Sequence, residues 1–256
     1  MIPSSYGGNY SPLTTNWINA TGESNPTILN ALNTFEDGLI TNSFVSRLLA
    51  VYPLVGGNST KHAFNFMNTS SFALTFFGGI THNANGYTPN GSTGYAKPGI
   101  TPQTHLPLAE NSFGFYSRTN GASNSYDISS RSGNNGMNLA TKWNDNNTYY
   151  SSNDDVVAGA GNHLPNTLKL ISVNRVAGVK KLFQNGVLMS SHTIATTSAV
   201  VPEIHISAQI QNGAINAYST RNLSFVYFAT ASFSDSEMLT FSNLVQQLQT
   251  SLNRQV

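Results

Sequence analysis

The sequence predicts a mainly β protein in which two antiparallel sheets pack face to face. From about residue 54 onward, short runs rich in aromatic and β-branched residues alternate with clusters of Gly, Asn, Ser and Pro. Many short strands at this spacing are typical of a sandwich or jelly roll. The most specific local signal is Asn185-Gly186 in "VKKLFQNGVLMSS", because this dipeptide readily adopts positive φ and marks a two-residue hairpin. We therefore expect an antiparallel two-sheet jelly-roll sandwich.

The composition agrees with this fold class. The chain has 256 residues, of which 39% are hydrophobic, enough for one large all-β domain or two small ones. Only 9% are charged, against roughly 25% in an ordinary soluble domain. Asn alone makes up about an eighth of the chain. Asn, Ser and Thr bond to nearby backbone groups and favour turns over helices.

The charge pattern excludes several classes of partner. Twelve basic and eleven acidic residues leave a net charge of +1, and Lys180-Lys181 is the only adjacent basic pair. This predicts no nucleic-acid partner and no binding to an anionic membrane. The absence of cysteine excludes disulfides and thiolate metal sites. The first residues lack the pattern of a signal peptide, and no apolar run approaches the roughly 18 residues of a membrane span. We expect a soluble protein without membrane insertion.

Residues 1–53 are expected to precede the sandwich. Residues 1–24 are rich in Gly, Ser, Asn and Thr, which predicts an extended arm that needs a neighbour to order it. Apolar residues at helical spacing then predict two short helices, the first beginning near Pro26 and the second ending at Pro53. The positions that carry this prediction are Ile28, Leu29, Leu32 and Phe35 in the first helix, and Phe44, Val45, Leu48 and Leu49 in the second.

The sandwich is expected over residues 54–233, followed by a C-terminal helix over 234–256. Ser234 and Glu237 have the spacing of a capping box, which marks a helix start. Apolar residues from Met238 to Leu252 follow at helical spacing. We expect this helix to pack on the sandwich.

Three motifs in the C-terminal third occur in a recognisable order: "LFQNG" at 182–186, "LSFVYF" at 223–228 and "FSDSEM" at 233–238. This order resembles the last third of concanavalin A-like, laminin-G-like jelly rolls. The resemblance covers residues 160–240 by motif and about 54–256 by strand rhythm. It implies a lectin-like sandwich with the hairpin as scaffold.

A narrower resemblance involves "AVYPLVGGNSTKHAFNFMN", "LTFFGGITHNANGYTPNGSTGYA", "FGFYSRTN" and "LNRQV". Together these are similar to a domain of bacteriophage tail or fibre proteins. The resemblance implies a structural protein on the virion surface, in a homo-oligomer and in contact with other virion proteins, that attaches to host glycans. The helical flanks would then serve assembly contacts.

Two other functions are open. One is a free carbohydrate-binding, lectin-like module. The other is a glycoside hydrolase, which needs two carboxylates flanking the scissile bond. The E-x-D-x-x-E spacing of laminarinase-type jelly rolls is absent, and Asp127 is the only acid in a plausible mid-strand position. We therefore expect no enzymatic activity.

The histidines do not predict a metal site. None of the six pairs at i, i+2 or i, i+4, so a sequence-local zinc site is not expected. His205, in "EIHISAQI", is expected to be an exposed strand residue.

Calcium is the one cofactor that the sequence suggests. Asp145, Asp154 and Asp155 lie in "WNDNNTYYSSNDDVV", and such loop carboxylates are ligands that calcium prefers. The alternative is that these residues are ordinary turn formers.

A glycan surface would combine aromatic faces with planar polar groups. Trp143, Tyr149 and Tyr150 lie in the same segment as the acids, and Tyr116 and Arg118 lie in "FYSRTN". The alternative is that these aromatic residues pack between the sheets or at a subunit contact. The segment around Trp143 is the favoured site.

Overall fold

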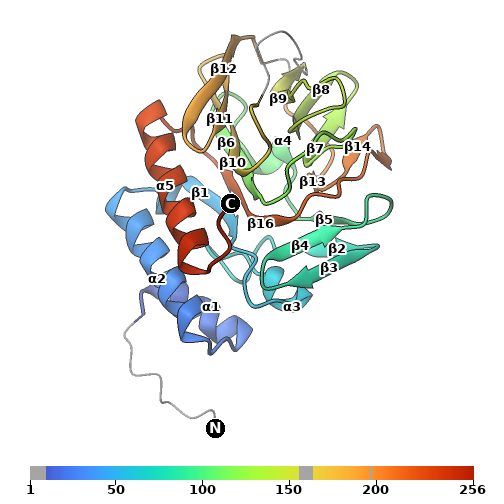
Figure 1. Ribbon diagram of the computed structural model, residues 1–256. Helices are drawn as coiled ribbons and strands as arrows, with labels where there is room; N and C mark the ends of the chain where they lie inside the picture. The colour runs from blue at the N-terminus through green and yellow to red at the C-terminus, as the bar shows by residue number, and fades with distance from the viewer. Residues whose placement is uncertain (1–9, 156–163, 197) are drawn as a thin grey trace.

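A computed structural model describes residues 10–155, 164–196 and 198–256. In this part of the chain, two eight-stranded sheets form a sandwich, and three longer helices lie against one of them (Figure 1). The mainly β two-sheet sandwich is therefore confirmed. Among the described residues, no helix has the length and hydropathy needed to cross a bilayer.

The first sheet is antiparallel throughout, and its central strand β16 has neighbours on both sides. In spatial order it contains β12 (Val187–Thr193), β11 (Val179–Gln184), β10 (Lys169–Val176), β6 (Asn111–Ser117), β16 (Leu223–Ala229), β4 (Gly86–Pro89) and β3 (Ile80–Asn83), with β1 (Leu48–Tyr52) also paired to β16.

The second sheet consists of shorter strands. In spatial order it contains β15 (Ala214–Asn216), β14 (Gln209–Gln211), β7 (Ile128–Ser132), β13 (His205–Ile206), β5 (Tyr95–Lys97) and β2 (Thr75–Phe77), with β8 (Asn135–Ala140) joining β7 to β9 (Tyr149–Asp155). Among the described strands of this sheet, β14 is the one that pairs in parallel, with β7.

Apolar side chains from both sheets meet in a sandwich core. Phe113 and Val173 of the first sheet lie there with Ile128, Leu139 and Ile206 of the second, all fully buried. They alternate along each strand with residues that point to the opposite face. This alternation produces the two-layer arrangement.

A second core, the helix core, lies on the other face of the first sheet. It is covered by α1 (Pro12–Thr21), α2 (Pro26–Thr41) and α5 (Asp235–Ser251), and Figure 1 shows α2 and α5 side by side there. Phe225 meets Phe35 edge-on at 5.7 Å between ring centroids, and Tyr227 meets Phe241 at 4.8 Å. All seven residues of β16 are therefore buried, since its two faces serve two cores.

The segment after α5 is held on the sandwich by Arg254. Its buried guanidinium donates to the carbonyls of Pro53 (2.5 Å), Leu54 (2.9 Å) and Ser224 (2.9 Å). These bonds join the end of the chain to the segment after β1 and to the central strand.

Two local signals in the sequence are confirmed. Asn185 (φ 50°) and Gly186 (φ 80°) form the turn between β11 and β12, as their positive φ values require. Ser234 accepts a hydrogen bond from the backbone N–H of Glu237, and the Glu237 carboxylate accepts one from the N–H of Ser234. This is the capping box that starts α5.

The predicted second N-terminal helix is wrong. Residues Val45–Arg47 form one 3₁₀ turn (η1), and Leu48–Tyr52 form strand β1. Ala50 and Tyr52 face the sandwich core while Leu48 and Val51 face the helix core. A strand buried on both faces is a continuous apolar run, which periodicity cannot distinguish from a helix.

The predicted extended arm is also wrong where the structure describes it. Residues 12–21 form α1, whose Trp17 is fully buried, while residues 1–9 lie outside the described residues. The buried Glu36 carboxylate accepts the backbone N–H groups of Leu13 and Thr14, both at 2.8 Å. A carboxylate at this end of α1 satisfies free N–H groups and complements the helix dipole.

The hairpin turn offers a matched pair of variants. Gly178 (φ 82°) and Gly186 (φ 80°) end the turns at the two ends of β11 and have nearly the same backbone angle. A Cβ at position 178 would meet nothing within 4 Å, whereas one at position 186 would lie 2.6 Å from Leu239 Cα.

We expect Gly178→Ala to cost about 1–2 kcal/mol of unfolding free energy, from the left-handed backbone alone. Gly186→Ala should cost about 1–3 kcal/mol more, because the turn must move away from α5. Urea unfolding of both variants measures the difference. Equal losses of unfolding free energy in the two variants would show that a Cβ at position 186 does not clash with α5.

Candidate functional site

Three aromatic side chains form a hollow at the loop between β8 and β9. Tyr126 precedes β7, Trp143 lies in the loop and Tyr149 begins β9, and together they line a cavity of about 200 Å³. Trp143 meets both tyrosines edge-on, with ring centroids 5.6 Å from Tyr126 and 5.8 Å from Tyr149. Trp143 and Tyr149 are half-buried, so part of each ring faces solvent. We call this group the aromatic hollow.

The loop that carries Trp143 is fixed by its own backbone. The Trp143 N–H donates to the Asn147 carbonyl (2.8 Å), and the Asn146 N–H donates to the Trp143 carbonyl (2.9 Å). Asn146 has φ 65°, a conformation that Asn tolerates better than most residues. The Asn144 N–H donates to Asn124 Oδ1 (3.1 Å), which ties the loop to a neighbouring one. These bonds fix the backbone that carries the indole.

Asp145 places a carboxylate beside the aromatic rings. Its Oδ2 accepts the Tyr149 hydroxyl (2.7 Å), and its Oδ1 accepts the Asn147 N–H (2.9 Å). Hydrogen bonds from Asn147 and from the Tyr149 hydroxyl lower the pKa of Asp145, and the same contact raises the pKa of Tyr149. The carboxylate is therefore ionised at neutral pH and can accept further hydrogen bonds.

The other wall of the hollow is less exposed. Tyr126 is buried, and burial raises the pKa of its phenol, an effect that Arg131 and Gln209 partly oppose. The hollow thus joins apolar ring surface to a carboxylate on one side and to guanidinium and amide groups on the other.

The structure brings together only part of the predicted glycan surface. Trp143 and Tyr149 lie in the hollow, but Tyr150 points to the opposite side of β9 and is fully buried in the sandwich core. Tyr116 is buried in the helix core, where its hydroxyl donates to Gln246 (3.0 Å), and Arg118 donates to the Arg254 carbonyl (2.7 Å). The prediction of a surface role is wrong for Tyr150 and Tyr116.

Tyr126 is the member of the hollow that the sequence did not reveal. It lies in "SYDISS", which reads as one continuous strand, whereas β7 begins only at Ile128. The Tyr126 N–H donates to the Ala217 carbonyl (3.0 Å), a contact far away in the sequence. No local pattern encodes that contact.

The predicted calcium ligands do not fit a common site. Asp145 lies in the turn before β9, while Asp154 and Asp155 end that strand. The buried Asp154 is already paired with Arg175 and with Lys180 Nζ, the latter at 2.8 Å. Within the described residues, no three His, Cys, Asp or Glu side chains gather where they could hold a metal ion. Asp154 belongs to a buried ion cluster instead.

Asp127, the candidate hydrolytic acid, is buried in a structural network. Its Oδ2 accepts the N–H and the hydroxyl of Thr141 (3.1 and 2.5 Å), and its Oδ1 accepts the Ser219 hydroxyl (2.9 Å). Arg221 Nε lies 3.3 Å from Oδ1. Both carboxylate oxygens are thus engaged by the protein.

Two histidine findings were not predicted. His205 is buried and stacks on Tyr95, with centroids 5.1 Å apart, so the expectation of an exposed side chain is wrong. The fold also brings His62 and His82 together, with their Nδ1 atoms 3.0 Å apart. One imidazole donates to the other, a contact between segments that sequence spacing cannot show.

No protein-family model matches the chain, and no curated protein matches it. Solved structures do match. Domain 4 of AbnA, a GH43 extracellular arabinanase from Geobacillus stearothermophilus solved with arabinotriose, aligns with a TM-score of 0.53 at 15% identity, over 77% of this chain and 98% of the domain. The likeness supports a two-sheet β-sandwich fold.

Two larger proteins contain the same fold. Trypanosoma rangeli sialidase, solved with sialic acid, aligns with a TM-score of 0.56 at 11% identity, over 77% of this chain and 33% of the sialidase. Botulinum neurotoxin type C, whose cell entry is described as dependent on interaction with two ganglioside molecules, aligns with a TM-score of 0.55 at 12% identity, over 80% of this chain and 53% of that one. The chain thus spans about a third to a half of these two structures, and at such identities the likeness shows the fold alone.

Proposed function

We propose that the protein is a carbohydrate-binding module and that the aromatic hollow receives one sugar ring. The arrangement of Trp143, Tyr149 and Asp145 carries this proposal. The apolar C–H face of a sugar packs on aromatic rings, while its hydroxyls donate to a carboxylate. Because Asp145 is ionised, a neutral sugar fits the hollow better than an acidic one.

The structural neighbours support a sugar ligand in a general way. The arabinanase domain was solved with arabinotriose, the sialidase with sialic acid, and the toxin is described with gangliosides. These ligands belong to those proteins. What they support is that this sandwich is a suitable scaffold for glycan recognition.

Binding without hydrolysis is the second part of the proposal. Glycoside hydrolysis uses a pair of carboxyl groups roughly 5–10 Å apart. Both carboxylate oxygens of Asp127 contact protein groups, on Thr141, Ser219 and Arg221. One oxygen of Asp145 accepts a tyrosine hydroxyl, and the other accepts a backbone N–H of its own turn. Both carboxylates therefore support binding and architecture.

A role on a bacteriophage particle, in a homo-oligomer with other virion proteins, is a narrower proposal. It rests on the similarity of "AVYPLVGGNSTKHAFNFMN" and its companion motifs to tail and fibre domains. Mass spectrometry of purified particles from a host that carries the gene tests it. Absence of the protein from those particles would rule the virion role out.

We expect Trp143→Ala to weaken glycan binding at least tenfold, which corresponds to about 1.4 kcal/mol, because the stacking surface is lost. A glycan array identifies the best neutral sugar, and isothermal titration calorimetry compares wild type with the variant. Phe77→Ala is the matched control, since this ring is 37% exposed but lies on edge strand β2, outside the hollow. Unchanged affinity in Trp143→Ala would contradict the assignment of the site.

A further inference from the structure

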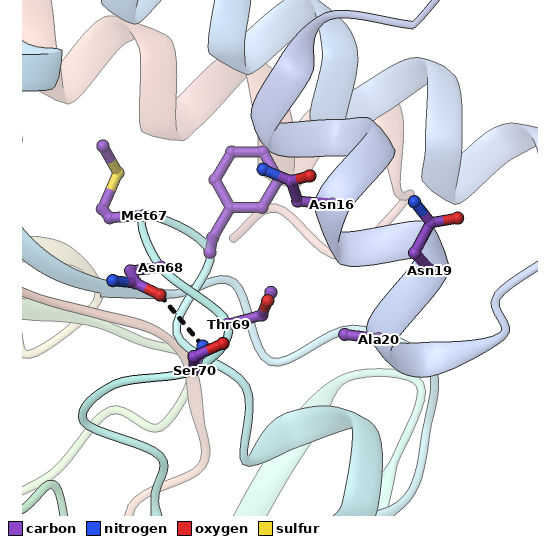
Figure 2. Close-up of a pocket in the computed structure, with 8 residues that line it drawn as sticks. Asn16, Asn19, Ala20, Met67, Asn68, Thr69 and Ser70 are labelled. Atoms are coloured by element: carbon purple, nitrogen blue, oxygen red, sulfur yellow. Dashed lines mark hydrogen bonds between the residues drawn. The ribbon is translucent and has the colours of Figure 1, made fainter.

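A larger cavity lies between α1 and the segment of residues 66–70. Its volume is about 510 Å³, within the range of roughly 300–1,000 Å³ usual for ligand sites. Asn16 and Asn19 lie one helical turn apart on α1, and Asn68, Thr69 and Ser70 form the facing wall (Figure 2). We call this cavity the amide cleft.

The loop wall of the amide cleft is rigid. Asn65, which is fully buried, uses its whole side-chain amide to shape it. Its Oδ1 accepts the N–H groups of Val51 and Met67 (both 3.0 Å), and its Nδ2 donates to the carbonyls of Leu49 (3.2 Å) and Ser71 (3.3 Å). The loop is thereby fixed to strand β1.

The helix wall is equally fixed. The Glu36 carboxylate holds the first turn of α1, and Trp17 is anchored in the helix core. Both walls are therefore in place before a ligand arrives, which reduces the entropy lost on binding.

The amide cleft offers many hydrogen bonds and no charge. Asn16 and Asn19 are exposed, and their side chains make no hydrogen bond to any described residue. Asn68 accepts the Ser70 N–H (3.0 Å, dashed in Figure 2), so its amide NH₂ group stays available. Each amide presents donors and an acceptor in one plane, which matches the paired hydroxyls of a sugar.

The apolar part of the cleft completes this chemistry. Met67 and Ala20 contribute apolar surface to the lining, which also includes the largely buried Phe66. An ionic ligand would find no counter-charge among the lining residues. A neutral ligand with many hydroxyls would find both partners and apolar contact.

We propose that the amide cleft is a second carbohydrate site, which binds an uncharged oligosaccharide through Asn16, Asn19 and Asn68. It shares the ligand class of the proposed function but none of its residues. The aromatic hollow lies on the second sheet, whereas the amide cleft lies in the helical layer beyond the first sheet.

The test uses the full chain and a panel of neutral and sialylated oligosaccharides. Trp143→Ala weakens binding at the aromatic hollow, so the affinity for the sugar that remains in this variant reports on the amide cleft. We expect that adding Asn16→Ala and Asn19→Ala to Trp143→Ala lowers this remaining affinity at least tenfold. Asn243→Ala is the matched control, because Asn243 is an exposed helical asparagine on α5 outside the cleft. NMR of the side-chain amides should show the Asn16 and Asn19 signals shifting when the neutral sugar is added.

Three outcomes would overturn the proposal. The first is a sugar affinity that does not change when Asn16→Ala and Asn19→Ala are introduced. This result would overturn the amide cleft whatever the effect of Trp143→Ala, so the two proposed sites are tested independently. A preference of this site for sialylated over neutral sugars would overturn its ligand class. Amide signals that stay in place at saturating sugar would place the ligand elsewhere.

Discussion

Asp127→Asn is expected to lower the free energy of unfolding by about 3–5 kcal/mol, the usual cost of removing one partner from a buried ion pair. The substitution removes the counter-charge of Arg221, whose guanidinium is almost fully buried and also donates to the carbonyls of Thr119 (3.2 Å) and Gly121 (2.7 Å). Urea unfolding at pH 7 measures the loss.

Asp145→Asn is the matched control for that experiment. Asp145 is exposed, and an asparagine there can still accept the N–H of Asn147, so we expect a change below about 1 kcal/mol. An Asp127→Asn protein of unchanged stability that had lost a polysaccharide-cleaving activity would reverse the interpretation, making Asp127 a catalytic acid.

Acidification is expected to destabilise the protein through His62. This imidazole is fully buried, and burial, with the charges of His82 and Arg254, lowers its pKa from 6.5 to about 3. Burial lowers the pKa of His82 as well. When the folded-state pKa of a histidine is depressed, the unfolded state binds the proton first, so stability falls as pH drops below about 6.5.

At pH 4.5 the cost from His62 alone should approach about 3 kcal/mol, because this pH lies two pH units below 6.5 and each unit costs roughly 1.4 kcal/mol. The geometry agrees, because two Nδ1 atoms 3.0 Å apart share one proton, and a second proton breaks the contact. Urea unfolding between pH 4 and pH 8 measures the slope.

His62→Gln should flatten that slope over the same range. The variant is first measured at pH 8, where its own packing cost is separated from the proton-linked term. A variant that kept the wild-type slope would assign the acid sensitivity to other groups.

The sequence predicted those parts of the fold whose stabilising contacts are local. The Asn185-Gly186 turn and the Ser234–Glu237 capping box each close within three residues, so their patterns are visible in a short window. Helix α1 was missed because its cap, Glu36, lies 22 residues from Thr14. Strand β1 was missed because both of its faces are apolar.

The site was predicted in part for the same reason. Trp143 and Tyr149 lie close together in one segment of the sequence, so composition alone pointed to them. Tyr150 was placed with them although neighbouring residues of a strand face opposite sides, and the register that decides which one faces the core depends on the partner strand β8. Tyr116 lies on β6, which is buried on both faces.

The central strand β16 also determines how cooperatively the protein unfolds. Its residues enter the two cores in turn, Val226 and Phe228 on one side, Phe225 and Tyr227 on the other. Loss of α5 would expose the face of β16 that packs in the helix core. It would also break the hydrogen bonds from Arg254 to the carbonyls of the segment after β1. We therefore expect the helical layer and the sandwich to unfold as one cooperative unit. Limited proteolysis between them should release no independently stable fragment, and a thermal melt should show a single transition.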